Sequence, residues 1–326
     1  MIPYTDMHCD TLMRAYVSRK ENVYELPDLM LDVKRLQAGG ALAQFFAIYM
    51  LAEDMRAQLG PAFPKDMDYI KALLRIHRET MKQHGDIIAE ARSLAEYTEN
   101  KASGRISGIL SLEDGRAVDG SMEKLHWLYG EGIRMIALTW NYENCFGYPN
   151  SKDTLVMEQG LKAFGKEAIA VMNDLGIIID VSHLSDGGFW DIVKLSKKPF
   201  VASHSNCRAI APHPRNLTDD MIRVLAEKGG VMGLNFCGPF LNEDTAGRES
   251  RIPQMIKHLK HMINVGGIDV AAIGTDFDGT YGDFDIPDCS KMQRLFETME
   301  KEDFTHEQIE KIAYKNVERV VREVWK

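Results

Sequence analysis

The sequence lacks the cysteine pattern of a disulfide-rich or zinc-ribbon protein. Its five cysteines, Cys9, Cys145, Cys207, Cys237 and Cys289, are scattered along the chain and form no Cys-x-x-Cys pair. Disulfide frameworks and structural Cys-zinc sites usually need even numbers at short, regular spacings. We therefore expect free thiols and a reducing compartment, which for this chain means the cytoplasm.

Long apolar runs and basic tracts are missing as well. The longest apolar run, residues 41–51, is interrupted by Gln44 and is too short to span a bilayer. Residues 1–10 have neither the basic nor the apolar region of a signal peptide. The net charge is -9, and a field of that sign repels nucleic acid backbones and anionic membranes. We expect neither as a partner.

The chain does contain short apolar segments that alternate with helix-like segments. Strict strand–helix alternation favours a parallel sheet, and eight such units are the number that closes a (β/α)8 TIM barrel. We predict an α/β fold of this kind as a single domain over residues 1–326, with loop insertions near 52–66, 238–251 and 280–303. A doubly wound open sheet is the competing fold, but no Gly-rich dinucleotide fingerprint follows an early strand. The candidate strands are residues 3–10, 41–50, 106–114, 134–140, 177–183, 200–205, 231–237 and 270–279.

Helix signals lie between these strands. Thr218 is a candidate N-cap, and Thr305 with Gln308 has capping-box spacing. Residues 67–97 read as one long amphipathic stretch. Six histidines fall in helical segments, where we expect them on solvated faces: His77, His84, His126, His258, His261 and His306.

Metal-ligand side chains recur at the ends of the candidate strands. In a parallel barrel these ends meet at one mouth, where active sites are built. Three histidines with at least three carboxylates would therefore converge, and imidazole with carboxylate is the ligand mix of zinc and related divalent ions. Each residue alone is weak evidence, but their joint placement predicts a metal site. The residues are His8, Asp10, Glu113, His183, His204, Asp276 and Asp278.

The motifs around these residues form an ordered set along nearly the whole chain. They are HCD, SLEDG, DVSH, SHSNCRAIAPHPRN and GTDFDG. As a set they resemble the membrane (renal) dipeptidase family of binuclear zinc peptidases, peptidase family M19, in a microbial-type member. The resemblance implies a metallo-dependent hydrolase barrel that cleaves the peptide bond of L,L and, in some members, L,D dipeptides; some members also open certain β-lactam rings.

The resemblance also implies roles for these residues. Two Zn2+ ions would be bound, one by His8 and Asp10 and one by His183 and His204. Glu113 and a hydroxide would bridge them, since a carboxylate has two oxygens and can serve both ions. Asp276 matches the family's acid/base carboxylate, which would pass a proton from the bridging water to the leaving amine.

Substrate contacts are implied less uniformly. Arg215 matches the arginine that grips the free C-terminal carboxylate of a dipeptide. Trp140 stands where animal members have a histidine, so Asn141 or Asn144 becomes a candidate for its hydrogen bond to the scissile carbonyl. Phe240 stands where animal members have a tyrosine. These two departures affect substrate preference and leave the metal ligands intact.

Two other functions stay open at this point. The same metal core could act on a cyclic amide or lactone, as an amidohydrolase-like enzyme. A non-catalytic metal- or peptide-binding relative would be favoured by the loss of a core residue, and none is missing. The family often forms dimers, which leaves a homodimer open, although no stretch of this sequence reads as an interface.

Overall fold

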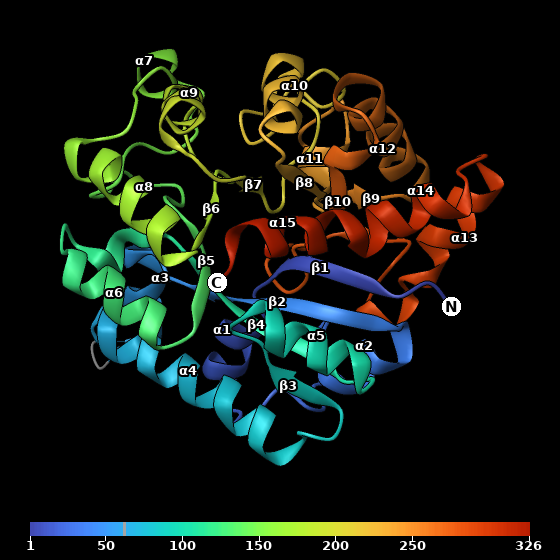
Figure 1. Ribbon diagram of the computed structural model, residues 1–326, viewed down its shortest axis with the longest axis horizontal. Helices are drawn as coiled ribbons and strands as arrows, with labels where there is room; N and C mark the ends of the chain where they lie inside the picture. The colour runs from blue at the N-terminus through green and yellow to red at the C-terminus, as the bar shows by residue number, and fades with distance from the viewer. Residues whose placement is uncertain (61–62) are drawn as a thin grey trace.

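The computed structural model describes residues 1–60 and 63–326, and in this part of the chain eight parallel strands form a closed barrel (Figure 1). Their order is β2-β1-β10-β8-β7-β6-β5-β4, and β2 pairs with β4 to close the ring. The predicted TIM barrel is therefore confirmed. The strands are β1 (Tyr4–Cys9), β2 (Ala41–Tyr49), β4 (Ile106–Glu113), β5 (Ile133–Ala137), β6 (Ile178–Asp180), β7 (Val201–Ala202), β8 (Val231–Leu234) and β10 (Ala271–Ile273).

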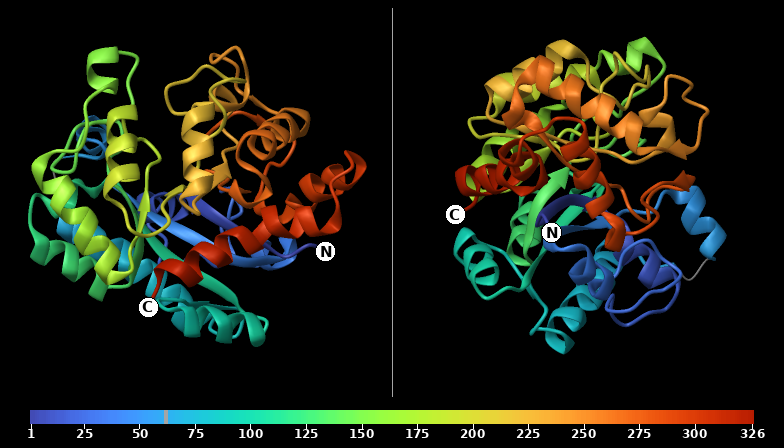
Figure 2. Two further views of the ribbon diagram at one scale, coloured as in Figure 1. Left: turned by 45° about the horizontal axis from the view of Figure 1, so that its top comes forward. Right: turned by 90° about the vertical axis from the view of Figure 1, so that its right-hand side faces the viewer.

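Helices cover the outside of the barrel (Figure 2). The side chain of Thr218 caps α10, and Thr305 and Gln308 form the predicted capping box of α14. The helices are α1 (Thr11–Val17), α2 (Val33–Gly39), α3 (Glu53–Leu59), α4 (Asp66–Gln83), α5 (Leu94–Ala102), α6 (Met122–Gly130), α7 (Thr154–Met157), α8 (Ala163–Leu175), α9 (Asp186–Leu195), α10 (Asp219–Glu227), α11 (Gly238–Leu241), α12 (Ile252–Gly266), α13 (Gln293–Lys301), α14 (His306–Glu310) and α15 (Asn316–Val324).

The amphipathic stretch of residues 67–97 is divided between two helices. α4 ends at Gln83, and the chain then forms β3 (Ile88–Glu90) before α5 begins. β3 pairs with the first residues of β4, and the Ser93 side chain caps the new helix by accepting from Glu96 N. Pairing with a distant strand thus overrides the helical periodicity of this stretch.

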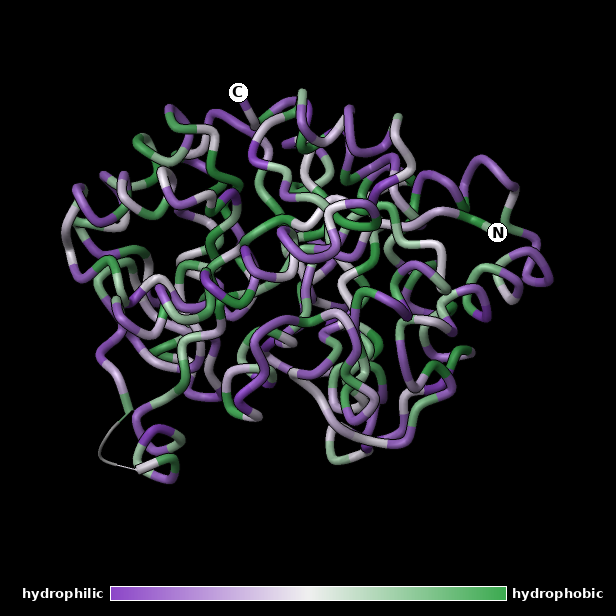
Figure 3. Tube along the Cα trace, turned by 90° about the horizontal axis from the view of Figure 1, so that it is seen from below, coloured by the Kyte–Doolittle hydropathy of each residue, from purple (hydrophilic) through white to green (hydrophobic). Residues whose placement is uncertain are grey.

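The barrel interior is apolar at the end opposite the predicted site. Inward residues from all eight strands form one buried cluster with α15. Hydrophobic and hydrophilic residues alternate in short stretches along the whole trace (Figure 3). Arg319 of α15 donates to the carbonyl of Gly229, just before β8, so the helix lies at the N-terminal ends of the strands. α15 therefore closes that end. The cluster contains Met7, Phe45, Ile109, Met135, Ile178, Val201, Val231, Ala272, Val317, Val320, Val321, Val324 and Trp325.

The segments at the other end follow the strands as insertions. Residues 52–66 contain α3, although positions 61–62 lie outside the described residues. Residues 238–251 contain α11 and β9 (Glu249–Ser250), and residues 280–303 contain β11 (Asp283–Phe284) and α13. β9 and β11 pair with each other as a small parallel sheet. Among the described residues, no helix has the length and apolarity needed to cross a membrane.

Two of the helical histidines are not on solvated faces, which corrects the prediction. His77 in α4 and His258 in α12 are completely buried. Position on a helix does not decide exposure when neighbouring strands and helices cover several faces of it.

Candidate metal centre

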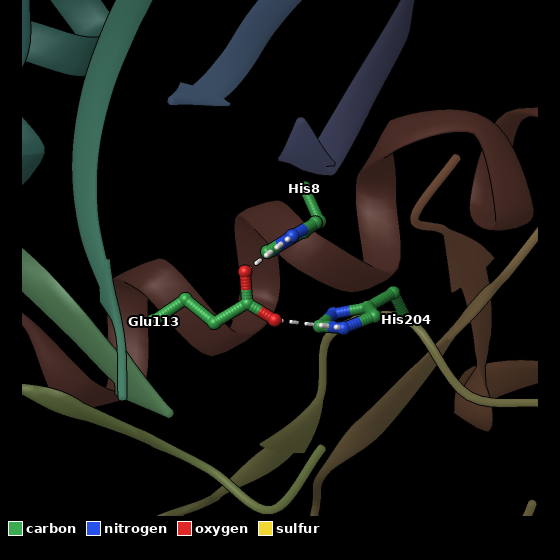
Figure 4. A group of neighbouring side chains, drawn as sticks. All are labelled: His8, Glu113 and His204. Carbon is green, nitrogen blue, oxygen red and sulfur yellow. Dashed lines mark ion pairs between the residues drawn. The ribbon is translucent and has the colours of Figure 1, made fainter. Parts of the chain in front are cut away.

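Six of the predicted metal-site side chains meet at the C-terminal end of the barrel, and Figure 4 shows three of them, His8, Glu113 and His204. His8 is 2% exposed, Glu113 3% and His204 1%, so their polar atoms are withdrawn from water. The converging ends of parallel strands place residues from distant parts of the sequence together. The six are His8 in β1, Asp10 directly after it, Glu113 at the end of β4, His183 beyond β6, His204 beyond β7 and Asp276 beyond β10.

Glu113 lies between two groups of potential ligands. Its Oε2 is 3.3 Å from Nε2 of His8, which is itself 3.8 Å from Asp10 Oδ1. Its Oε1 is 3.0 Å from Nε2 of His183 and 3.6 Å from Nε2 of His204. The two histidine Nε2 atoms are 3.1 Å apart. Each oxygen of this carboxylate thus faces a separate set of donors.

The spacing of the six residues, and three unpaired atoms among them, fit bound divalent cations. Nitrogen and oxygen ligands about 2.0–2.2 Å from one zinc ion lie about 3–4 Å from each other, as these atoms do. His8 Nε2, Asp10 Oδ1 and Glu113 Oε2 are buried without a hydrogen-bond partner among the described residues. Leaving such groups unpaired is costly, and a cation among them would satisfy all three.

Left-handed backbone occurs at two of these residues. His183 has φ 68° and Asp276 has φ 63°. β6 ends at Asp180 and β10 at Ile273, so both side chains project from the turns just beyond their strands rather than from the strand ends themselves. For residues other than glycine this conformation costs about 1 kcal/mol each. Strain of this kind concentrates where side chains must be aimed at a site.

Carboxylates dominate the electrostatics of the centre. Burial alone would lower the pKa of His8, but Glu113, Asp10 and Asp276 raise it to about 10. Burial raises the pKa of Asp10 well above its usual range, and the charge of Glu113 raises it further. Burial raises the pKa of Asp276 to about 6, opposed by His8 and assisted by Glu113. His204 is buried near His8, and both effects hold its pKa well below 6.5.

Trp140 and Asn141 lie next to His183. The ring centroids of Trp140 and His183 are 6.1 Å apart, and the indole also meets the ring of Tyr49 edge-on at 5.2 Å. Oδ1 of Asn141 is 3.0 Å from Nδ1 of His183. An amide oxygen only accepts, so in this orientation of Asn141 the His183 ring donates from Nδ1, and a neutral ring then has its lone pair on Nε2, which faces the centre.

Arg215 contacts Ser205 and the backbone of His204. It is 5% exposed, and its Nη1 and Nη2 donate to Ser205 Oγ and to the carbonyl of His204, each at 3.2 Å. Its Nε is buried and has no partner among the described residues. The guanidinium carbon is 5.3 Å from the ring centroid of Phe240, a cation–π distance. Arg215 and Phe240 therefore form one side of the site.

Asn144 directs its amide into the surrounding loop. Its Nδ2 donates to Asp114 Oδ1 and to the carbonyl of Leu138, and its Oδ1 accepts from Phe146 N. Asn235 was not among the predicted residues, yet its Nδ2 donates to Asp276 Oδ2 at 3.1 Å. It directly follows β8, so a search for polar side chains at strand ends could have included it.

Residues 1–326 match the model of a family described as membrane dipeptidase (peptidase family M19). A metallo peptidase from Rhodobacter sphaeroides, solved with a phosphinate mimic of the dipeptide L-Ala-D-Ala, is 28% identical, with a TM-score of 0.88 over 99% of each chain. A solved dipeptidase of family M19 is 29% identical, with a TM-score of 0.87 over 99% of each chain.

A curated relative is similar over part of its length. An uncharacterized dipeptidase of Schizosaccharomyces pombe is 35% identical over 67% of this chain, and the match covers 53% of that protein.

Proposed function

Since this chain belongs to the membrane dipeptidase family, peptidase family M19, and is a metallo-dipeptidase, we propose that it uses two zinc ions to hydrolyse L,L and L,D dipeptides. The observation that supports two ions is Glu113, whose two oxygens face separate sets of donors. His8 and Asp10 would hold one ion, His183 and His204 the other, and Glu113 would bind both. When bound, the ions would supply Lewis-acid activation of water and of the scissile carbonyl.

Arg215 is proposed to bind the C-terminal carboxylate of the dipeptide. Its buried guanidinium has an unpaired Nε and lies beside the centre. A planar guanidinium can bind a carboxylate with two hydrogen bonds. A longer peptide would present a neutral amide there, so this contact restricts the enzyme to dipeptides.

Asp276 is proposed to move the proton. Its Oδ2 accepts from Asn235, whereas its Oδ1 is directed at His8, 3.9 Å from Nε2. Oδ1 would take a proton from the attacking water and deliver it to the leaving amine. A carboxylate with one oxygen free to face the reacting water can both accept and release a proton.

The remaining predicted residues are proposed to line the substrate site. Trp140, which lies beside His183, and Phe240, which lies beside Arg215, would provide aromatic surfaces, and Asn141 would hold His183. Asn144 stays a weaker candidate, because its amide atoms already have partners in the loop. The ligand of the Rhodobacter sphaeroides protein, a mimic of L-Ala-D-Ala, supports the inclusion of L,D dipeptides. A single domain, a cytoplasmic location and a homodimer stay predictions.

Metal analysis of the purified protein and an assay across L,L and L,D dipeptides test this function. We expect two zinc ions per chain, and we expect Asp276→Asn to keep them while kcat falls roughly 10²–10⁴-fold. Protein without bound zinc, cobalt or manganese that hydrolyses no dipeptide would contradict the proposal.

The role of Arg215 needs its own comparison. Arg215→Ala should lower kcat/KM for dipeptides strongly, whereas Arg223→Ala, an exposed arginine of α10, should not. Unchanged kcat/KM in Arg215→Ala would instead favour hydrolysis of a cyclic amide or lactone by the same centre.

A further inference from the structure

Asp180, the last residue of β6, lies beneath the centre and is 1% exposed. Its Oδ1 accepts from the backbone N–H groups of Ser182 and Ser203, each at 2.9 Å. Its Oδ2 accepts from the hydroxyl of Ser203 at 2.5 Å. The two oxygens therefore have different partners, and the backbone holds the carboxylate in one orientation.

The hydroxyl of Ser203 connects Asp180 to His204. Its Oγ is 2.7 Å from Nδ1 of His204. Because the hydroxyl hydrogen is directed at Asp180, Oγ can meet Nδ1 only as an acceptor, and Nδ1 must carry the ring proton. In neutral His204 the lone pair is then on Nε2, which faces Glu113 Oε1 and His183 Nε2.

We propose that Asp180, acting through Ser203, is the positioning residue that sets the tautomer of His204 and so makes its Nε2 a metal ligand. This inference rests on the proposed function, because it takes His204 as a ligand. Groups behind metal-binding histidines commonly fix the ring and its tautomer. Here the link is indirect, since a serine hydroxyl stands between the carboxylate and the ring.

The two histidines of this ligand pair are held by different acceptors. His183 donates to the amide oxygen of Asn141, whose side chain could equally offer an N–H group after rotation. A carboxylate offers no donor in any orientation. Asp180 therefore imposes one direction on the hydrogen-bond chain to His204.

Asp180→Asn should reverse that chain. The two backbone N–H groups would keep the amide oxygen at the Oδ1 position, which places the NH2 group where Oδ2 was. The NH2 group would donate to Ser203 Oγ, and the hydroxyl hydrogen would turn toward His204 Nδ1. His204 would then carry its proton on Nε2, the atom that should bind metal.

The test measures tautomer and metal affinity separately. Ring-nitrogen NMR shifts of His204 are recorded in metal-free protein and assigned by comparison with His204→Gln. Zinc affinities of both sites are measured by competition with a chelator. We expect Asp180→Asn to move the proton from Nδ1 to Nε2 and to weaken one of the two zinc sites about 10–100-fold.

Three further variants separate this role from a structural one. Ser203→Ala should leave the tautomer unfixed and weaken the same zinc site, and Ser203→Thr, which keeps a hydroxyl, should restore both. Asp6→Asn is the matched control for the tautomer, because Asp6 is also completely buried and also accepts a hydroxyl, that of Thr275, but its contact with His8 is to the backbone N–H and not to a ring nitrogen. It should leave the His204 tautomer unchanged.

The outcomes distinguish the inference from the proposed function. Asp180→Asn and Ser203→Ala proteins with the wild-type tautomer and wild-type zinc affinities would overturn the inference alone. Wild-type protein that binds no zinc would overturn the proposed function, and the tautomer in metal-free protein would still decide the inference. If Asp180→Asn does not fold, the Ser203→Ala and Ser203→Thr pair gives the same decision.

Discussion

His77 makes the stability of the protein sensitive to acid. It is completely buried in α4, and neither ring nitrogen has a hydrogen-bond partner among the described residues. Its ring packs edge-on against Phe46, with centroids 5.7 Å apart. Burial, assisted by the charges of Arg78 and Arg92, lowers its pKa from 6.5 to about 3. The folded protein therefore holds His77 neutral at pH values where the unfolded chain is protonated.

The size of the effect follows from these two pKa values. Between about 6.5 and 3 the unfolded state binds one proton more, so the free energy of unfolding falls as the pH falls. Each pH unit in this range contributes about 1.4 kcal/mol, so His77 should remove about 2 kcal/mol at about pH 5. Above 6.5 neither state is protonated at His77 and the penalty disappears.

His77→Leu should abolish this penalty. The substitution removes two unpaired polar atoms and breaks no hydrogen bond, so near neutral pH we expect equal or higher stability. The difference in the free energy of unfolding between variant and wild type should be about 2 kcal/mol larger at about pH 5 than near neutral pH. Urea unfolding at both pH values measures this difference, and the pH dependence of every other group cancels in it.

His258→Leu is the matched control for the effect near neutral pH; burial lowers the pKa of His258 as well, to about 4, so its removal should also reduce the acid sensitivity. His258 is also completely buried, but its Nδ1 accepts from Cys207 N and its Nε2 donates to the carbonyl of Leu241. Its loss leaves two buried backbone groups unpaired, which costs about 1–3 kcal/mol each near neutral pH. An equal effect of His77→Leu at both pH values, or a loss near neutral pH as large as that of His258→Leu, would refute the reasoning.

Three further predictions concern the site and one helix. Glu113→Gln should lower the metal content after dialysis, because an amide offers only one oxygen and cannot serve both zinc sites; retention of both ions would contradict a shared ligand. Arg215→Lys should raise KM roughly tenfold or more with a smaller change in kcat, since a point charge cannot make the bidentate contact. Steady-state kinetics measure both constants, and an unchanged KM would argue against binding of the substrate carboxylate by Arg215. Thr305→Ala should cost about 1 kcal/mol by removing the cap of α14, and a change in urea midpoint near zero would show that the capping box contributes nothing.

The overall fold could be predicted from the sequence because the patterns that indicate its strands and helices are local. Each barrel strand is a short apolar run followed by a helical pattern, and caps such as Thr218 and Thr305 depend on neighbours within four residues. The break within the stretch 67–97 was not predicted, because it depends on the pairing of β3 with β4, which the local pattern does not encode.

The sequence alone predicted six of the residues that gather at the barrel mouth, because the ends of parallel strands must meet there whatever the side chains are. Their arrangement needed the tertiary structure. The separate partners of the two Glu113 oxygens, the position of Asn235 and the chain from Asp180 to His204 all depend on distances between residues far apart in sequence. The same holds for His77 and His258, which look alike in the sequence. Both are buried, and only the packing of distant segments decides which of them finds hydrogen-bond partners.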